Sequence, residues 1–259
     1  MNKLKQLCCT LNMLLCLTVL LTACSKKDDP EPEIPPIEDT TPTDESMFYK
    51  LHRVENFAGD TEYDGPLDGP RAAIYFSLEA KKGIQQLYQK SNLWDISFSD
   101  IANAKIGTNN GKSSSSLGAG SSGVGGIYIT DKPFEEVTDA PADSEFKITN
   151  FLDENGAFGN GLGWAMYDWD GNKVDPNGDY ATKGHVCYAL GNPITLSNGK
   201  TIVRTLVVKT AKGNYAKIKM ISIYQDITNP LNMMRKSKYP YFTFEYVLVP
   251  AGSTKFEIK

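Results

Sequence analysis

Alternation of apolar and polar positions marks the chain from residue 48 onward. The clearest instance spans residues 239–249, where every second residue from position 242 is aromatic or aliphatic. Such a period of two is typical of a β-strand with one face buried. The pattern predicts a strand whose buried face carries Phe242, Phe244, Tyr246 and Leu248.

Five further segments are rich in β-branched and aromatic residues and are bounded by Gly, Pro, Asn or Asp, as strands usually are. They are residues 73–78, 93–98, 126–129, 202–209 and 215–224. The last two are joined by residues 210–214, a glycine-containing loop of hairpin length. The apolar face changes near Met220, which predicts either a β-bulge or burial of both faces.

Helical patterns are scarce. Residues 133–137 suit a single helical turn, residues 78–88 suit either structure, and the sequence has no internal repeat. The prediction is therefore one all-β domain, β-rich with at most short helices. We expect two packed, mostly antiparallel sheets or an irregular half-barrel.

The first residues have the pattern of an export signal. Lys3 and Lys5 precede a mostly apolar run at 11–21, which is shorter than the roughly 20 apolar residues that span a bilayer. Small residues then lead to Cys24. We expect residues 1–23 to be a removable signal peptide and Cys24 to carry a lipid. The alternative is an ordinary secretory signal followed by an incidental cysteine.

Residues 24–46 predict an extended tether. The segment holds eight acidic residues and five prolines without an apolar period, so it cannot bury enough surface to offset its ordering entropy. Its acidic residues after Cys24 resemble the surface-export signal of Bacteroidetes lipoproteins, which implies an outer-membrane lipoprotein exposed at the cell surface. An acidic linker without a sorting role is the alternative. Residues 47–259 would then form the single domain.

Charge and cysteine content narrow the picture further. The acidic residues concentrated in the tether leave the domain close to neutral, whereas nucleic-acid binding needs a basic face. Cys187 is the single cysteine of the expected domain, so no disulfide forms within it. We expect a domain that relies on its own core and binds no nucleic acid.

Catalytic constellations are missing from the sequence. The two histidines, His52 and His185, leave little for a Ser-His-Asp or Cys-His arrangement. Cys187 follows His185 by two residues and would share its strand face, but a small buried cysteine beside a hydrogen-bonded histidine is the commoner arrangement. No local spacing supplies further zinc ligands. We therefore expect a binding protein and not an enzyme.

Two loops need an interpretation. Residues 168–175 partly match a calcium-binding loop, but Asp179 stands where that motif has its closing glutamate, so an Asp-Gly turn is favoured. Residues 109–126 are rich in glycine and serine but lack the Gly-Lys-Ser/Thr and helix of a phosphate-binding loop. We expect this second segment to be a flexible loop that leads into a strand.

The order of several motifs resembles one protein family over essentially the whole domain. The motifs are NLWDISF at 92–98, TNNG at 108–111, GVGGI at 123–127, GWAMY at 163–167, TAKGNYAKI at 210–218 and YPYFTFEY at 239–246. Together they resemble the HmuY-like haem-binding lipoproteins of Bacteroidetes. That resemblance implies a β-rich protein that captures haem outside the cell and passes it to a TonB-dependent outer-membrane receptor.

The resemblance also implies that two axial side chains hold the haem iron, two histidines in some members and two methionines in others. Imidazole nitrogen and thioether sulfur are both haem-iron ligands. Here residues 130–165 contain neither residue type, and the second family position falls near Trp169, which cannot bind iron. The nearest candidates are Met166 and His185, with core packing or a structural hydrogen bond as the alternative roles.

Several other side chains near these candidates suit an apolar slot for the macrocycle. The wall candidates are Tyr128, Trp164, Tyr167 and Trp169, although the core of a sheet uses the same residue types. Met233 and Met234 lie in a loop rich in Lys and Arg and are candidates to close over a ligand. His52 has no motif around it.

A second interpretation keeps the fold and drops haem. Without an axial pair, the same domain would be a surface-displayed binding module for a glycan, another small ligand or a protein partner. A glycan site predicts exposed aromatic side chains, such as Trp169, on a rim.

Overall fold

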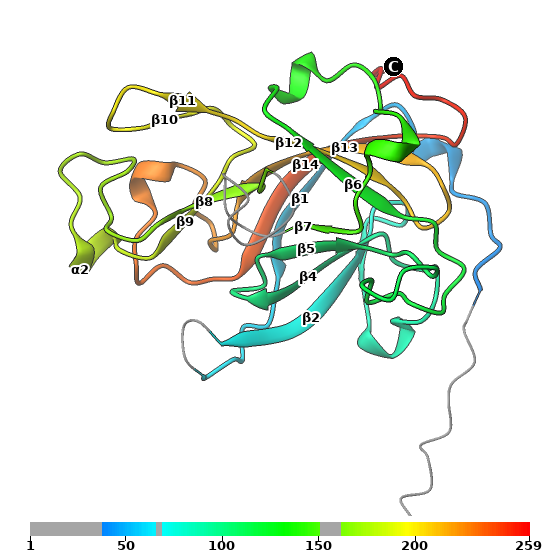
Figure 1. Ribbon diagram of the computed structural model, residues 1–259, viewed down its shortest axis with the longest axis horizontal. Coiled ribbons are helices and arrows are strands. Elements are labelled where there is room, and N and C mark those ends of the chain that lie inside the picture. The colour runs from blue at the N-terminus through cyan, green and yellow to red at the C-terminus, as the bar shows by residue number, and fades with distance from the viewer. Residues whose placement is uncertain (1–37, 66–68, 151–161) are drawn as a thin grey trace, which may run out of the picture. The chain divides into compact units, whose positions relative to one another are not determined.

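The computed structural model describes residues 38–65, 69–150 and 162–259, which belong to one compact unit. The expected signal peptide, Cys24 and the first part of the expected tether lie outside the described residues. Within the described part of the chain, no helix has the length and apolar character needed to cross a membrane. The fold consists mainly of two five-stranded sheets and two short ribbons (Figure 1), which confirms the predicted β-rich class.

The first sheet has the strand order β1-β14-β13-β12-β6, and all its neighbouring strands are antiparallel. Its strands are β1 (Leu51–Ala58), β14 (Tyr241–Val249), β13 (Tyr215–Ser222), β12 (Thr205–Lys209) and β6 (Gly126–Thr130). The loop at 210–214 joins β12 to β13, as predicted for a hairpin. The register of β13 against β14 shifts between Met220 and Ser222, and Met220 and Ile221 are both buried, so both of the predicted alternatives are present here.

The second sheet has the strand order β3-β2-β4-β5-β7, again antiparallel throughout. Its strands are β3 (Lys82–Ile84), β2 (Pro70–Ser77), β4 (Ile96–Ile101), β5 (Lys105–Thr108) and β7 (Thr149–Asn150). Short 3-10 turns connect the strands of the domain. They are η1 (Glu45–Met47), η2 (Gln86–Tyr88), η3 (Phe134–Glu136), η4 (Asp143–Glu145) and η5 (Pro230–Asn232).

Aromatic rings from the two sheets pack directly against each other. Phe76 of β2 meets Phe244 of β14 edge-on with ring centroids 5.3 Å apart, and Phe98 of β4 stacks on Phe242 at 4.0 Å. All four side chains are buried. Aromatic pairs in such geometries contribute roughly 0.5–1.5 kcal/mol beyond the burial of their surface. These rings fill the space between the sheets, so a slot for a flat ligand has to lie elsewhere.

Strand β14 is covered on both faces. The four residues predicted for its buried face are all fully buried in the main core. Val247 and Val249 on its other face join a second apolar cluster with Phe134, Val137 and Phe256. The segment around η3 and the C-terminal residues therefore cover the outer face of the first sheet. Alternation in the sequence locates the strand, but it does not reveal a cover made by distant irregular segments.

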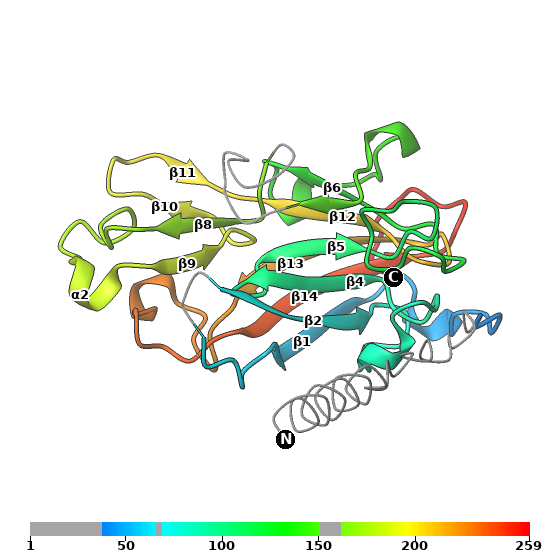
Figure 2. The ribbon, with the colours of Figure 1, turned by 60° about the horizontal axis from the view of Figure 1, so that its bottom comes forward.

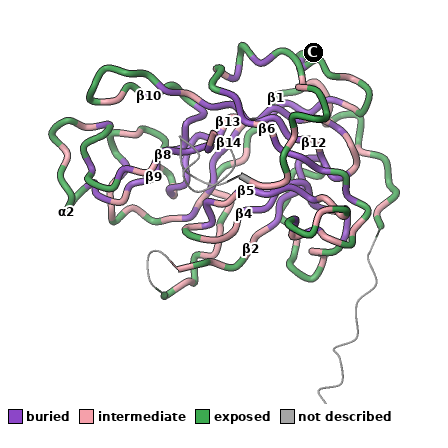
Figure 3. The backbone as a smooth tube through the Cα atoms, in the orientation of Figure 1, coloured by how far each residue is buried: buried purple, intermediate pink, exposed green. Residues whose placement is uncertain are grey.

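Two short antiparallel ribbons complete the fold. Strand β8 (Ala165–Asp168) pairs with β9 (Val186–Ala189), and β10 (Ile194–Thr195) pairs with β11 (Thr201–Ile202). Helix α2 (Tyr180–Lys183) lies in the connection between β8 and β9. Figures 1 and 2 place this connection at the end of the domain away from the blue N-terminal segment. Burial is concentrated on the sheet strands, whereas α2 is largely exposed (Figure 3).

The predicted strands are present, with boundaries that differ by a few residues. The segment at 202–209 is divided into β11 and β12, because the backbone N–H of Arg204 donates to Leu190 O outside the ladder. The segment at 93–98 becomes a strand only at Ile96. The ambiguous residues 78–88 hold both a strand, β3, and a 3-10 turn, η2.

The glycine-serine segment expected to be a flexible loop is packed around one asparagine. Asn109 is fully buried, and its side-chain N–H groups donate to the carbonyls of Ser91 at 2.7 Å and Trp94 at 2.9 Å. Its Oδ1 accepts from the hydroxyl of Ser121 at 2.8 Å. A Cβ at Gly123 would lie 2.5 Å from the same Oδ1. The small residues therefore let the loop close around Asn109, a role that composition alone does not reveal.

Candidate ligand-binding site

His185 lies between α2 and β9, and three aromatic side chains surround it. The centroid of its ring is 5.9 Å from that of Tyr167, 4.5 Å from that of Trp169 and 5.2 Å from that of Tyr180. All three contacts are edge-on. Tyr167 belongs to β8, Trp169 follows β8 directly, and Tyr180 begins α2. These four residues are called the aromatic cluster below.

Both ring nitrogens of His185 face tyrosine hydroxyls. Nδ1 lies 2.6 Å from Oη of Tyr167, and Nε2 lies 2.8 Å from Oη of Tyr180. In the neutral form imidazole has one donor and one acceptor nitrogen, so one tyrosine hydroxyl accepts a hydrogen bond from the ring N–H and the other donates one to the ring. Burial raises the pKa of Tyr167 to about 12, which keeps that hydroxyl protonated at neutral pH.

The local sequence fixes the position of the histidine. His185 has a left-handed backbone with φ of 64°, and its N–H donates to Trp169 O at 3.3 Å. Asp179 caps α2, because its carboxylate accepts from two backbone N–H groups of the first turn. A Cβ at Gly184 would lie 2.4 Å from Tyr180 O and 2.9 Å from the Tyr180 ring. The glycine therefore allows Tyr180 to lie close to the histidine.

The loop after β8 is the Asp-Gly turn that the sequence favours. Asp168 is buried, and its two carboxylate oxygens accept from the N–H groups of Gly171 and Lys173, both at 2.8 Å. The backbone of the loop therefore uses the oxygens that a calcium ion would need. Across the three described ranges, no group of three or more His, Cys, Asp or Glu side chains is arranged to hold a metal ion.

Part of the aromatic cluster faces solvent beside a positive charge. The side chain of Trp169 is 58 % exposed and that of Tyr180 is 47 % exposed. The guanidinium of Arg235 lies 4.7 Å from the centroid of the Tyr180 ring and donates to Tyr180 O at 3.3 Å. An exposed aromatic surface next to a cation suits a flat apolar ligand that carries acidic groups.

Met166 does not share this surface with His185. It is fully buried in the main core. Successive residues of a strand point to opposite sides, and Tyr167 points to His185, so Met166 of β8 points away from it. The structure does not bring together the two side chains that the sequence proposes as axial ligands.

The four aromatic residues expected to line a slot separate into two groups. Tyr167 and Trp169 belong to the aromatic cluster. Trp164 is fully buried in the core, where its Nε1–H donates to Ala104 O at 2.8 Å. Tyr128 packs against the second apolar cluster on the outer face of the first sheet. Sheet packing accounts for Trp164 and Tyr128.

Of the remaining candidates, His52 and Met233 lie in the body of the domain and Met234 lies nearer its surface. His52 stacks on Tyr246 with ring centroids 4.9 Å apart, and its Nε2 lies 2.7 Å from Met47 O. Met233 is buried in the main core, whereas Met234 is half-buried in the loop that carries Arg235. Of Met233 and Met234, only Met234 therefore lies near the surface that carries Arg235.

Sequence reasoning missed Tyr180 and Arg235. Tyr180 reaches His185 because a single helical turn intervenes, and Arg235 reaches Tyr180 across more than fifty residues of chain. The one available signal was Asp179, a residue type that commonly caps a helix. It indicates the turn, but it does not indicate the direction of the Tyr180 ring.

Comparison with known proteins assigns the family. The family model described as HmuY protein matches residues 71–246 of this chain. Among curated proteins there is no match to the sequence. The match to the family model covers more than half of the chain, which confirms the resemblance stated from the motifs.

Solved structures that match the chain share little sequence identity with it. The apo HmuY analog of Tannerella forsythia is 15% identical, with 78% of this chain and 95% of that chain covered and a TM-score of 0.33. Apo PinO from Porphyromonas gingivitis is 16% identical, with 78% of this chain and 99% of that chain covered and a TM-score of 0.36. A protein of Bacteroides vulgatus described as HmuY-like and heme-binding is 15% identical, with 79% of this chain and 94% of that chain covered and a TM-score of 0.34. On the evidence of the family model, the chain belongs to the HmuY family.

Proposed function

We propose that this chain is a non-catalytic haem-binding protein and that His185 is an axial ligand of the haem iron. The observation that carries the proposal is a half-buried histidine among three aromatic rings, two of them largely exposed, in a member of the HmuY family. Imidazole is a strong ligand of haem iron, and aromatic side chains favour contact with a flat macrocycle.

Haem binding would keep one of the two hydrogen bonds of His185 and break the other. Tyr167 is half-buried on β8, so its hydroxyl can hold Nδ1–H while iron binds at Nε2. A metal-bound histidine usually donates its other N–H to such a partner, which fixes the ring. Tyr180, which belongs to the four-residue helix α2, forms a hydrogen bond with Nε2 through its hydroxyl, and its side chain is nearly half exposed. Rotation of the Tyr180 side chain would free Nε2 and leave its ring beside the macrocycle.

The charge of this end of the domain suits the two propionates of haem. Arg235 lies over the Tyr180 ring, and the exposed Lys236 and Lys238 follow it in the chain. Cationic side chains beside an apolar surface would orient the macrocycle with its propionates toward the loop at 235–238. Met234, half-buried in the same loop, is a candidate for the second axial position.

The wider proposal concerns location and transfer. We propose that residues 1–23 are a cleaved signal, that Cys24 carries a lipid, and that the protein is displayed on the outer membrane. A TonB-dependent receptor would then take the haem. The lipid is tested by expressing the full chain with radiolabelled palmitate, where label on the wild type and none on Cys24→Ser supports the anchor. Equal labelling of both proteins would overturn it.

Titration of the purified domain with haemin tests the ligand assignment. A saturable Soret shift is expected for the wild type at micromolar haemin, and His185→Ala should lose most of it. His52→Gln is the matched control, because His52 packs on Tyr246 and should leave the shift unchanged. Met166→Leu keeps the volume of the core and tests the other candidate ligand. An unchanged shift in His185→Ala, or a loss confined to Met166→Leu, would reject His185 as the ligand.

One observation favours a second candidate function. Trp169 is more than half exposed and lies at the rim of the aromatic cluster, as an aromatic platform for a sugar ring would. Retention of the protein on immobilised polysaccharide, lost in Trp169→Ala, combined with no response to haemin would support a glycan-binding module instead.

A further inference from the structure

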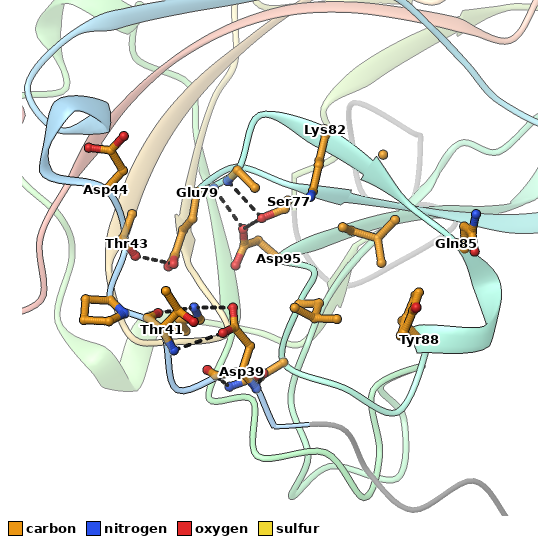
Figure 4. A pocket seen from close by; sticks show the side chains of 17 residues that line it. Asp39, Thr41, Thr43, Asp44, Ser77, Glu79, Lys82, Gln85, Tyr88 and Asp95 are labelled. Atoms are coloured by element: carbon orange, nitrogen blue, oxygen red, sulfur yellow. Dashed lines mark hydrogen bonds and ion pairs between the residues drawn. The ribbon is translucent and has the colours of Figure 1, made fainter.

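The last residues of the expected tether lie against the domain. Residues 39–44, called the strap below, form one wall of a pocket of about 540 Å³ that is also lined by the segment after β2 and by Lys212 of the β12–β13 hairpin (Figure 4). In Figures 1 and 2 the blue segment that includes the strap and helix α2, which carries Tyr180 of the aromatic cluster, lie at opposite ends of the domain. The composition of the segment predicts a solvated spacer as far as residue 46, yet the structure pairs its end with specific side chains.

Asn92 binds the backbone of the strap in both directions. Its Oδ1 accepts from the N–H of Asp39 at 2.7 Å, and its Nδ2–H donates to Asp39 O at 3.0 Å. Asn92 is buried beneath the strap. A side-chain amide that pairs with both backbone groups of one residue acts as a neighbouring strand would, and it holds an extended peptide at a fixed position.

Lys212 holds the strap by charge. Its ammonium lies 2.8 Å from Oδ2 of Asp39 and donates to Thr41 O at 2.7 Å. The hydrogen bond from Lys212 lowers the pKa of Asp39 to about 2, so the Asp39 carboxylate stays ionised at physiological pH. Lys212 lies in the β12–β13 hairpin loop, within the motif TAKGNYAKI at residues 210–218. This contact selects an acidic residue at the first position of the strap.

Buried polar side chains also bind the hydroxyl of Thr43. This hydroxyl donates to Oε2 of Glu79 and accepts from Nδ2 of Asn214 at 3.0 Å. Asn214 and Thr210 both donate to the other oxygen of Glu79, at 2.7 and 2.6 Å. Glu79 and Asn214 are both buried. The arrangement around Thr43 is therefore built into the domain and selects a hydroxyl-bearing residue.

The strap contributes no buried residue of its own. Asp39 and Thr43 are half-buried, and the other residues of the strap are exposed. Its attachment therefore depends on hydrogen bonds and one ion pair, each of which water can replace, and not on the burial of apolar surface. Such a contact is specific, because several donors and acceptors match, and it is also readily reversible.

We propose that Asn92, Lys212, Glu79 and Asn214 form a peptide-binding groove for an acidic, threonine-containing segment, and that the chain's own strap is its occupant. The strap can detach from the groove and bind again. Each detachment lengthens, by the residues of the strap, the part of the chain that precedes the folded domain. Six released residues add roughly 20 Å of reach at about 3.3 Å each. The groove is independent of the aromatic cluster, so the proposal stands or falls separately from haem binding.

Hydrogen exchange of the mature full-length protein, followed by NMR, tests the attachment. The N–H of Asp39 should be protected from exchange in the wild type. Lys212→Met should accelerate the exchange of this N–H at least tenfold, while the exchange rates of the N–H groups in β13 and β14 should stay unchanged. Lys90→Met, which removes an exposed lysine outside the groove, is the matched control and should change nothing. Raising the salt concentration to about 0.5 M should accelerate Asp39 exchange in the wild type, because the ion pair is partly exposed. Free exchange at Asp39 in the wild type, or protection unchanged in Lys212→Met, overturns the proposal.

A second measurement tests whether the groove is a binding site. The full-length variant Asp39→Ala/Thr43→Ala should release its own strap and leave the groove open. A labelled synthetic peptide of residues 38–45 should then bind this variant at least tenfold more tightly than it binds the wild type, where the attached strap competes at millimolar effective concentration. A peptide with Asp39 and Thr43 replaced by alanine is the control and should not bind. Equal or absent binding of the native peptide to the variant and the wild type would show that the strap is only packed in place.

Discussion

Replacement of Asp95 should destabilise the domain more than its side-chain volume indicates. Asp95 is only 2 % exposed, and its Oδ2 accepts from the N–H groups of Leu78 at 2.7 Å and Glu79 at 3.3 Å. Its Oδ1 accepts from the N–H of Ala211 at 3.0 Å. Leu78 follows β2 of the second sheet, and Ala211 lies in the hairpin of the first sheet. One carboxyl group therefore ties the two sheets together.

The magnitude follows from the donors left behind. Asp95→Ala would leave three buried backbone N–H groups without their acceptor, each at a cost of about 1–3 kcal/mol. Removal of the charge also relieves repulsion with the buried Glu79, which offsets part of the loss. We expect the free energy of unfolding to fall by about 3–5 kcal/mol. The melting temperature should fall by roughly 6–20 °C at about 2–4 °C per kcal/mol for a domain of this size.

Urea denaturation followed by tryptophan fluorescence measures this loss. Trp94 and Trp164 are both fully buried, so their emission reports unfolding of the core. Asp131→Ala, which removes an exposed carboxyl group after β6, is the control and should change the free energy of unfolding by less than about 0.5 kcal/mol. A loss below about 1 kcal/mol for Asp95→Ala would refute the role of Asp95 as a bridge between the sheets.

The pH dependence supplies an independent check on the same residue. Burial, and then the nearby Glu79, raise the pKa of Asp95 to about 7, above the value of 3.8 for an exposed carboxyl. The folded state therefore holds a proton that the unfolded state releases, so this contribution to stability is full below pH 4 and declines as the pH rises through 7. This contribution to the free energy of unfolding of the wild type should fall between about pH 4 and pH 7 and level off above that. Asp95→Asn cannot titrate and should show a flatter profile.

Three further substitutions test separate parts of the account. Gly125→Ala should lower the free energy of unfolding by about 1–3 kcal/mol in urea denaturation, because its Cβ would lie 2.6 Å from Asn109 O; no loss would contradict the close approach. Tyr167→Phe should weaken haemin affinity about tenfold in a Soret titration, since it removes the partner of His185 Nδ1; unchanged affinity would exclude that support. Tyr188→Phe should leave the melting temperature unchanged or raise it, because the buried Tyr188 hydroxyl has no hydrogen-bond partner within the described residues; a clear decrease would reveal a missed contact.

Periodicity carried most of the information on the fold. The alternation at 239–249 located β14, and the change of apolar face near Met220 located its neighbour's bulge. The pairing of β14 with β1, far away in the sequence, was not predictable, because register between distant strands depends on packing that one sequence does not display. The role of Asn109 was likewise hidden, since a glycine-serine loop has the same composition whether it is free or wrapped around a side chain.

Less of the site than of the fold was predictable. The sequence identified His185, Tyr167 and Trp169, which the structure brings together. It named Met166 and His185 because they lie nearest to the ligand position that the resemblance implies, whereas residue parity on β8 points Met166 into the core. The position of Tyr180 beside His185 depends on a helix of one turn, and so short a helix leaves little periodic signal in the sequence.

The most direct test of the central proposal compares haemin with metal-free protoporphyrin IX in the wild type and in His185→Ala. Stacking on aromatic side chains supports both ligands, whereas a bond to iron supports only haemin. We predict that His185→Ala weakens haemin binding at least tenfold and leaves protoporphyrin affinity within about twofold, which separates the iron bond from the apolar surface. Haemin affinity that is the same in both proteins would contradict ligation of iron by His185.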